Sequence, residues 1–136
     1  MELPNIKTKK MNVSEDIDVA YAALCARIYA KETGFSKKDQ YMIATAVSEL
    51  ARNIFVYAKK GTIYLKFIEK HSKRGVEVVA EDSGPGIGDI EMAMKDNFST
   101  GGTMGVGLPG TKRLMDDFQL DSHHTHGTKV IIRKWI

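Results

Sequence analysis

Three groups of residues in this 136-residue chain have the types and the order needed to hold a nucleotide. Glu49 and Asn53 are four residues apart, so a helix places both side chains on one side. A carboxamide oxygen is a suitable ligand for Mg²⁺, and a nearby carboxylate can position or deprotonate a hydroxyl that attacks a phosphate. Asp-Ser-Gly-Pro-Gly at 82–86 and a glycine-rich segment at 105–110 follow. We therefore interpret the three groups as one phosphate-transfer site.

Asp82 comes directly after a run of alternating apolar residues that is typical of a strand. A carboxylate at the mouth of an apolar slot can accept a hydrogen bond from the exocyclic amine of adenine. Gly84 and Gly86 let the backbone approach such a ring, because they carry no Cβ. The alternative is a plain tight turn, since Asp, Ser, Gly and Pro are common turn residues. For Glu49 and Asn53 the alternative is a pair of solvated polar residues on a helix surface. The glycine-rich segment later in the chain argues against this alternative.

The segment 105–110 matches the pattern G-x-G-x-x-G of dinucleotide-binding sites. That interpretation requires a strand immediately before the pattern and a βαβ unit around it, whereas a Gly- and Thr-rich loop precedes it here. The phosphate-binding pattern G-x-x-x-x-G-K-[ST] is absent. Glycines at a helix N-terminus still form an anion site, because free N–H groups and the helix dipole face the phosphate.

Two other features have simpler explanations. His123, His124 and His126 share a short loop, which favours a solvated turn over a metal site because no complete set of ligands stands nearby. Cys25, the only cysteine, has apolar neighbours on a predicted helix and is expected to be a buried, inert thiol.

The overall composition argues against two classes of partner. Lysine and arginine number 20 against 17 acidic residues, and no basic run is interleaved with aromatic residues, so nucleic acid is not expected. No apolar stretch approaches the ~20 residues of a membrane helix, and the N-terminus lacks the pattern of a signal peptide. We therefore expect a cytoplasmic protein that does not bind a membrane.

The periodicity of apolar residues predicts the elements that position these groups. Ile17, Tyr21, Leu24 and Ile28 recur at helical spacing, and Ser36 begins a second helix that Lys59, Lys60 and Gly61 close. Alternation predicts paired strands around 63–67 and 76–80, a third helix near Pro109, and strands at 118–122 and 128–135. These elements predict an α/β fold: one domain over 1–136, a two-layer sandwich with a mixed, mostly antiparallel sheet, helices on one face and an N-terminal edge strand at 1–11.

The nucleotide motifs, taken together with the late pair Gly127-Thr128, resemble the N box, G1 box, G2 box and closing Gly-Thr of the GHKL superfamily. That resemblance implies the Bergerat fold, in which ATP binds under a lid. Within the superfamily, the segments 48–53, 80–87, 98–102, 107–110 and 112–116 resemble small bacterial serine/threonine switch kinases. This implies ATP and Mg²⁺ as cofactors, with STAS-domain proteins of the stressosome as phosphoacceptors and a PP2C-type phosphatase as a partner activated by binding.

The resemblance also implies a role for individual residues. Asn53 is the Mg²⁺ ligand, Glu49 the catalytic base, and Asp82 the reader of adenine, with Thr128 assisting through water. The lid is expected at 83–105. The remaining residues implied to bind ATP are Gly84, Gly86, Ile87, Thr100, Gly101, Gly102, Gly105, Val106, Gly107 and Leu108.

One position departs from the family pattern. Many histidine kinases carry a Lys or Arg that contacts phosphate where this chain has Val56, so Lys112 or Arg52 is expected to supply the cation. The segment before Asn12 is too short for a helical hairpin carrying a phosphoacceptor histidine, so the acceptor hydroxyl is expected on another protein. Two alternatives remain: an anti-sigma factor with serine kinase activity, and a nucleotide-gated binding module that regulates a phosphatase.

Overall fold

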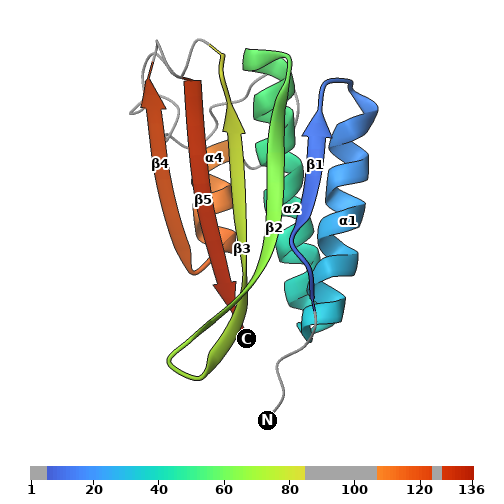
Figure 1. Cartoon of the computed structure of the whole chain (residues 1–136), viewed down its shortest axis with the longest axis vertical. Helices are drawn as coiled ribbons and strands as arrows, with labels where there is room; N and C mark the ends of the chain where they lie inside the picture. Colours follow the sequence, from blue (N-terminus) through green and yellow to red (C-terminus); the bar gives the residue numbers. More distant parts are fainter. Residues whose placement is uncertain (1–5, 85–106, 124–126) are drawn as a thin grey trace.

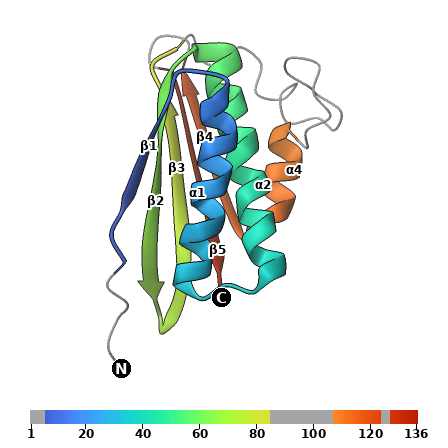
Figure 2. The ribbon, with the colours of Figure 1, turned by 90° about the vertical axis from the view of Figure 1, so that its right-hand side faces the viewer.

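The computed structural model describes residues 6–84, 107–123 and 127–136. A single five-stranded sheet forms one layer and the helices form the other, on one face of the sheet (Figures 1 and 2). In chain order the elements are β1 (Lys9–Val13), α1 (Ile17–Thr33), α2 (Lys37–Asn53), the π-helix η1 (Ile54–Ala58), β2 (Gly61–Lys70), β3 (Lys73–Asp82), α4 (Gly107–Leu114), β4 (Asp117–His123) and β5 (Gly127–Trp135).

The strand order is β1-β2-β3-β5-β4, and each of these neighbouring pairs is antiparallel. The predicted two-layer α/β fold is therefore confirmed, with a fully antiparallel sheet over these strands where the sequence predicted a mixed, mostly antiparallel one. The edge strand lies at Lys9–Val13 and pairs with β2, later in the chain than the predicted segment 1–11.

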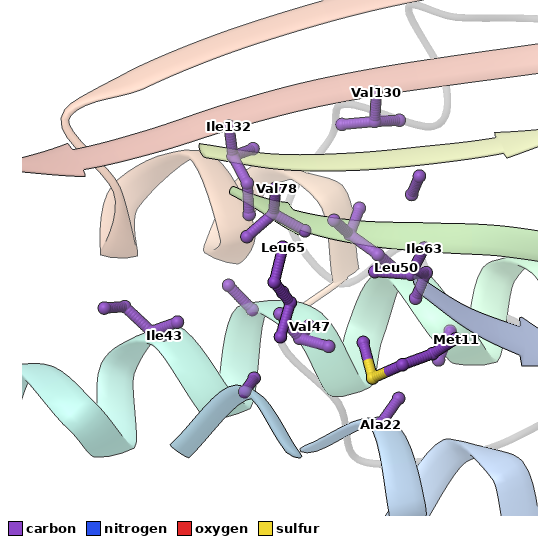
Figure 3. Close-up of a cluster of buried hydrophobic side chains, with 14 of the residues drawn as sticks. Met11, Ala22, Ile43, Val47, Leu50, Ile63, Leu65, Val78, Val130 and Ile132 are labelled. Carbon is purple, nitrogen blue, oxygen red and sulfur yellow. The ribbon is translucent and has the colours of Figure 1, made fainter. Parts of the chain in front are cut away.

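The core lies between the sheet and the helices. Alternate residues of the strands point toward α2, as Leu65, Val78 and Ile132 show in Figure 3. The facing side of α2 supplies Val47 and Leu50, which are also fully buried. Burying an aliphatic side chain of this size contributes about 1.5–3 kcal/mol. This shared core fixes α2 relative to the end of β3, and both elements carry predicted site residues.

The start of α2 agrees with the sequence, but its end does not. The hydroxyl of Ser36 accepts a hydrogen bond from the Asp39 N–H at 3.3 Å, which is an N-cap. After α2 the chain widens into the π-helix η1, and Lys59 makes the reversal with a left-handed φ of 71°. Gly61 is instead the first residue of β2, where an added Cβ would lie 2.6 Å from the carbonyl oxygen of Glu81. Close approach of β2 to β3 therefore requires this glycine.

Helix α1 ends at Thr33, where Gly34 takes the left-handed conformation and caps the helix. The buried side of α1 is made largely of small residues, among them Ala22 and Ala26. The four apolar residues whose spacing predicts this helix lie on the opposite, exposed side. Cys25 is half-buried and packs against the core, so the expected burial of its thiol is only partial.

A two-residue turn, His71-Ser72, joins β2 to β3. His71 and Ser72 have φ values of 52° and 66°, and such positive values at both positions favour Asn-Gly. We expect Ser72→Gly to raise the free energy of unfolding by about 0.5–1 kcal/mol, because removing left-handed strain outweighs the added flexibility of the unfolded chain. Urea denaturation measures this, with Ser72→Ala as control, since alanine keeps the strain. Equal stability of the two variants would contradict the explanation.

Candidate nucleotide-binding site

Asp82 ends β3 beside a small, mainly apolar slot. Its Oδ1 accepts a hydrogen bond from the Gly84 N–H at 2.9 Å. Burial raises the pKa of the Asp82 carboxyl, and hydrogen bonds from the backbone of Gly84 and Thr128 oppose that shift. The slot is lined by Leu50, Asn53, Ile54, Ala80, Asp82, Leu108, Thr128 and Val130. A carboxylate at the end of a strand thus borders an apolar slot, the arrangement that the sequence predicts.

The slot has a cavity of about 20 Å³, which is room for about one water molecule. A purine ring can therefore enter the slot only if the side chains that line it move apart. A larger and more open cavity of about 760 Å³ adjoins it and includes Asp82 and Thr128, but polar and charged residues such as Glu81 and Lys129 line much of the rest. The apolar slot therefore suits a purine ring better than the open cavity does. Both border Asp82 and Thr128.

Two glycines allow the close approach of backbone segments that builds this corner. A Cβ on Gly84 would lie 2.5 Å from the Cβ of Ala58 in η1. Gly127 has a φ of 87°, and a Cβ there would overlap the carbonyl oxygen of Asp82. Gly127 thereby holds Thr128 beside Asp82, and the Thr128 hydroxyl lies 2.9 Å from that of Ser122. Ala58 and Ser122 also shape this corner, although neither residue belongs to one of the three motifs, so no spacing in the sequence indicates their contacts.

Glu49 is buried, with 8% of its surface exposed, so it is not a solvated surface residue. Its Oε2 accepts a hydrogen bond from the N–H of Gly107, 58 residues away, at 3.2 Å. Gly107 begins α4 with a φ of 63°, and its carbonyl accepts a bond from the Thr111 hydroxyl. The carboxylate therefore lies at the positive end of a helix dipole, where a phosphate can also bind.

The structure brings the described members of the three motifs together. Glu49 and Asn53 come from α2, Asp82 from β3, Leu108 from α4 and Thr128 from β5. Asn53 is half-buried and lines the slot. The other predicted ATP ligands, Gly86, Ile87, Thr100, Gly101, Gly102, Gly105 and Val106, lie outside the described residues, as does most of the predicted lid 83–105. Their roles, and those of the residues placed here, stay predictions.

The proposed sources of a phosphate-contacting cation differ in setting. Val56 is a half-buried, uncharged residue of η1, so it cannot supply the cation that contacts phosphate. The Nε of Arg52 is buried and has no hydrogen-bond partner among the described residues, whereas Lys112 is exposed on α4. His124 and His126 lie outside the described residues, and the described part of the chain contains no group of three metal-ligating side chains.

Comparison with known proteins agrees with this architecture. The model of the "Histidine kinase-like ATPase domain" family matches residues 13–134. The serine/threonine-protein kinase RsbT of Bacillus subtilis (strain 168) is 47% identical over 126 residues, covering 93% of this chain and 95% of RsbT. An anti-sigma F factor of Thermoanaerobacter sp. (strain X514) is 35% identical over 142 residues, covering 100% of this chain and 93% of the factor.

Among solved structures, the mycobacterial sensor histidine kinase MprB aligns with a TM-score of 0.55 at 15% identity, covering 95% of this chain and 97% of that one. At that identity the likeness shows the fold alone. None of the helices in the described residues is long and apolar enough to cross a membrane. The family match over most of the chain and the close relative confirm the recognition made from the motifs: the chain belongs to the histidine kinase-like ATPase family of the GHKL superfamily.

Proposed function

We propose that this protein is an ATP-dependent serine/threonine kinase that transfers the γ-phosphoryl group of Mg·ATP to a hydroxyl on a partner protein. The observation that carries the proposal is the meeting of buried Glu49 with the N-terminus of α4, beside the slot that Asp82 borders. The 47% identity to a protein named serine/threonine-protein kinase RsbT supports the same reaction. A cytoplasmic location fits this role.

Each residue has a defined task in the proposed reaction. Asp82 accepts a hydrogen bond from the adenine amine, and the first N–H groups of α4 bind phosphate oxygens. Asn53 supplies one oxygen ligand to Mg²⁺. Bound Mg·ATP supplies the phosphoryl group and part of the charge neutralisation. Glu49 accepts the proton of the attacking hydroxyl while that hydroxyl oxygen bonds to the γ-phosphorus and the bond between the γ-phosphorus and ADP breaks.

The proposed acceptors are STAS-domain proteins of a stressosome, and the proposed second partner is a PP2C-type phosphatase that the protein activates by binding. The resemblance of the motifs to switch kinases is the basis for both partners, and the 47% identity to RsbT supports the kinase class. A direct test mixes this protein, a STAS-domain protein and ATP, and follows phosphorylation with time. Phosphoprotein is expected to accumulate with magnesium and to stop on chelation. ATP consumption without any phosphoprotein would contradict the kinase.

A second candidate is an anti-sigma factor with serine kinase activity, which the 35% identity to an anti-sigma F factor favours. Specific retention of a sigma subunit of RNA polymerase on the immobilised protein would support it. A nucleotide-gated binding module is the third candidate. A variant without phosphotransfer that still activated the phosphatase fully would favour that module over the kinase.

The raised pKa of Asp82 predicts a pH dependence of nucleotide binding. Because only the ionised carboxylate accepts a hydrogen bond from the adenine amine, ADP affinity should fall as the pH drops through the raised pKa of Asp82, at a pH above the ordinary value of 3.8. The effect on folding has the opposite sign: the stability contribution of this carboxyl is present below pH 3.8 and lost as the pH rises through the raised pKa. Calorimetric titration with ADP measures the binding, and Asp82→Asn removes the titrating group. Identical pH profiles of ADP affinity in the wild type and in Asp82→Asn would contradict the assignment of Asp82 as the group that binds adenine.

A further inference from the structure

Lys134 is a buried cation at one end of α4. It lies near the end of β5, and only 8% of its surface is exposed. On the inner side of β5 it continues the row formed by Thr128, Val130 and Ile132. Its Nζ donates a hydrogen bond to the carbonyl oxygen of Leu114, the last residue of α4, at 3.0 Å. Lys134 thus binds the C-terminal end of the helix whose first N–H groups are proposed to bind phosphate.

The charge of Lys134 matches the dipole of α4. A cation is stabilised at the C-terminal end of a helix, because the last carbonyl groups carry a partial negative charge. No carboxylate among the described residues forms an ion pair with Lys134, so the helix end compensates the charge of the ammonium group. At the opposite end, Glu49 accepts the N–H of Gly107. One end of α4 is therefore held by a buried carboxylate and the other by a buried ammonium group.

The stability of the fold does not by itself require a cation at this position. Burying an ammonium group costs free energy, and a well-packed apolar side chain of similar volume often stabilises a core as well or better. Two other bonds already fix the chain just after α4: the N–H of Asp116 donates to the Arg133 carbonyl at 2.9 Å, and its carboxylate accepts the Trp135 N–H at 2.7 Å. Of these three bonds, only that of Lys134 reaches a residue of α4 itself.

Lys134 acts on the nucleotide only through α4. The helix has 8 residues, so its two ends are about 12 Å apart, too far for the ammonium group to contact a phosphate bound at Gly107. The other end of β5 carries Thr128, which lines the slot beside Asp82. Strand β5 therefore contacts the base end of the site through Thr128 and the phosphate end through Lys134 and α4; Figure 1 shows α4 behind this strand.

We propose that Lys134 is a positioning residue whose ammonium group fixes the position of α4 along its axis. It thereby sets how well the N–H groups at Gly107 fit the phosphates of a nucleotide whose base occupies the slot. The inference rests on the proposed nucleotide chemistry and names a residue that adjusts it without touching the nucleotide. Its consequence is selective: Lys134 contributes to the binding of phosphates and not to the binding of the base.

Calorimetric titration of Lys134→Met with ATP and with adenosine separates these two contributions. Methionine fills the space of the lysine stem but cannot donate to the Leu114 carbonyl. ATP affinity should fall about 2–30-fold, the range expected for a charge at a helix end, whereas adenosine carries no phosphate and should bind as it does to the wild type. A merely structural role would leave the ratio of the two affinities unchanged, because a disturbed fold lowers both.

Three further variants complete the test. Lys70→Met removes the same charge from an exposed lysine at the far end of β2, and it should bind both ligands like the wild type. Lys134→Arg keeps a cation and should restore most of the ATP affinity. Lys134→Gln is a second neutral variant, and it gives the same ratio if thermal unfolding shows that methionine destabilises the fold.

An unchanged ratio of ATP to adenosine affinity in a folded neutral variant would overturn the proposal. So would a Lys134→Arg protein that is as stable as the wild type but binds ATP as weakly as Lys134→Met. A wild-type protein that binds no ATP would instead contradict the proposed function, and this inference with it. The failure of the positioning role and the failure of the kinase are therefore distinguishable.

Discussion

Replacing Glu49 by glutamine is expected to slow phosphotransfer by about 10²–10⁴-fold, the usual contribution of a general base. The amide keeps the shape of the side chain but cannot take a proton from the attacking hydroxyl. Its oxygen can still accept the N–H of Gly107, so the N-terminus of α4 should stay in place and ATP affinity should change little. Single-turnover phosphotransfer at saturating ATP measures the rate, and calorimetry measures the affinity.

Glu32→Gln is a matched control, because Glu32 is an exposed glutamate on α1. Its phosphotransfer rate should equal that of the wild type. Equal rates for Glu49→Gln and the wild type would remove the base assignment and leave Glu49 as a residue that only holds the start of α4. A fall in ATP affinity equal to the fall in rate would likewise show a binding role without base chemistry.

Replacing Asp82 by asparagine should weaken ADP binding by about 1–3 kcal/mol, or roughly 5–150-fold. Asparagine retains an oxygen for the Gly84 N–H, but its other group is then an NH₂ that faces the adenine amine, donor against donor. Inosine diphosphate carries a carbonyl oxygen where adenine has that amine. The variant should therefore bind inosine diphosphate better relative to ADP than the wild type does.

Calorimetric titration of both proteins with both nucleotides measures this reversal. The ratio of the two affinities is the decisive quantity, because a general disturbance of the slot would lower both affinities together. An unchanged ratio in Asp82→Asn would remove the adenine-reading role from Asp82.

The sequence predicts those parts of the molecule that local patterns determine. The cap of α2 is predictable because Ser36 and its hydrogen-bond donor Asp39 are only three residues apart. The alternation of apolar residues in β2 and β3 likewise identifies the buried sides of these strands. The motif residues Glu49 and Asp82 lie on the predicted helix and at the end of the predicted strand. Short-range rules suffice for each of these features.

The features that the sequence could not predict depend on contacts between distant segments. The bond from Gly107 to Glu49 joins residues 58 positions apart, and no spacing rule indicates it. Helical spacing shows that Tyr21 and Leu24 share a side of α1, but not whether the core covers that side. Small residues such as Ala22 form the buried side instead, because they allow close packing while giving a weak hydrophobic signal.

The measurement that tests the central claim most directly is the location and chemistry of the transferred phosphate. This protein, a STAS-domain partner and radiolabelled Mg·ATP are incubated together, the two chains are separated, and the label is tested for stability in acid and alkali. The account predicts label on the partner as a serine or threonine phosphoester, stable in acid and labile in alkali. Label on this chain as an acid-labile phosphohistidine would contradict it.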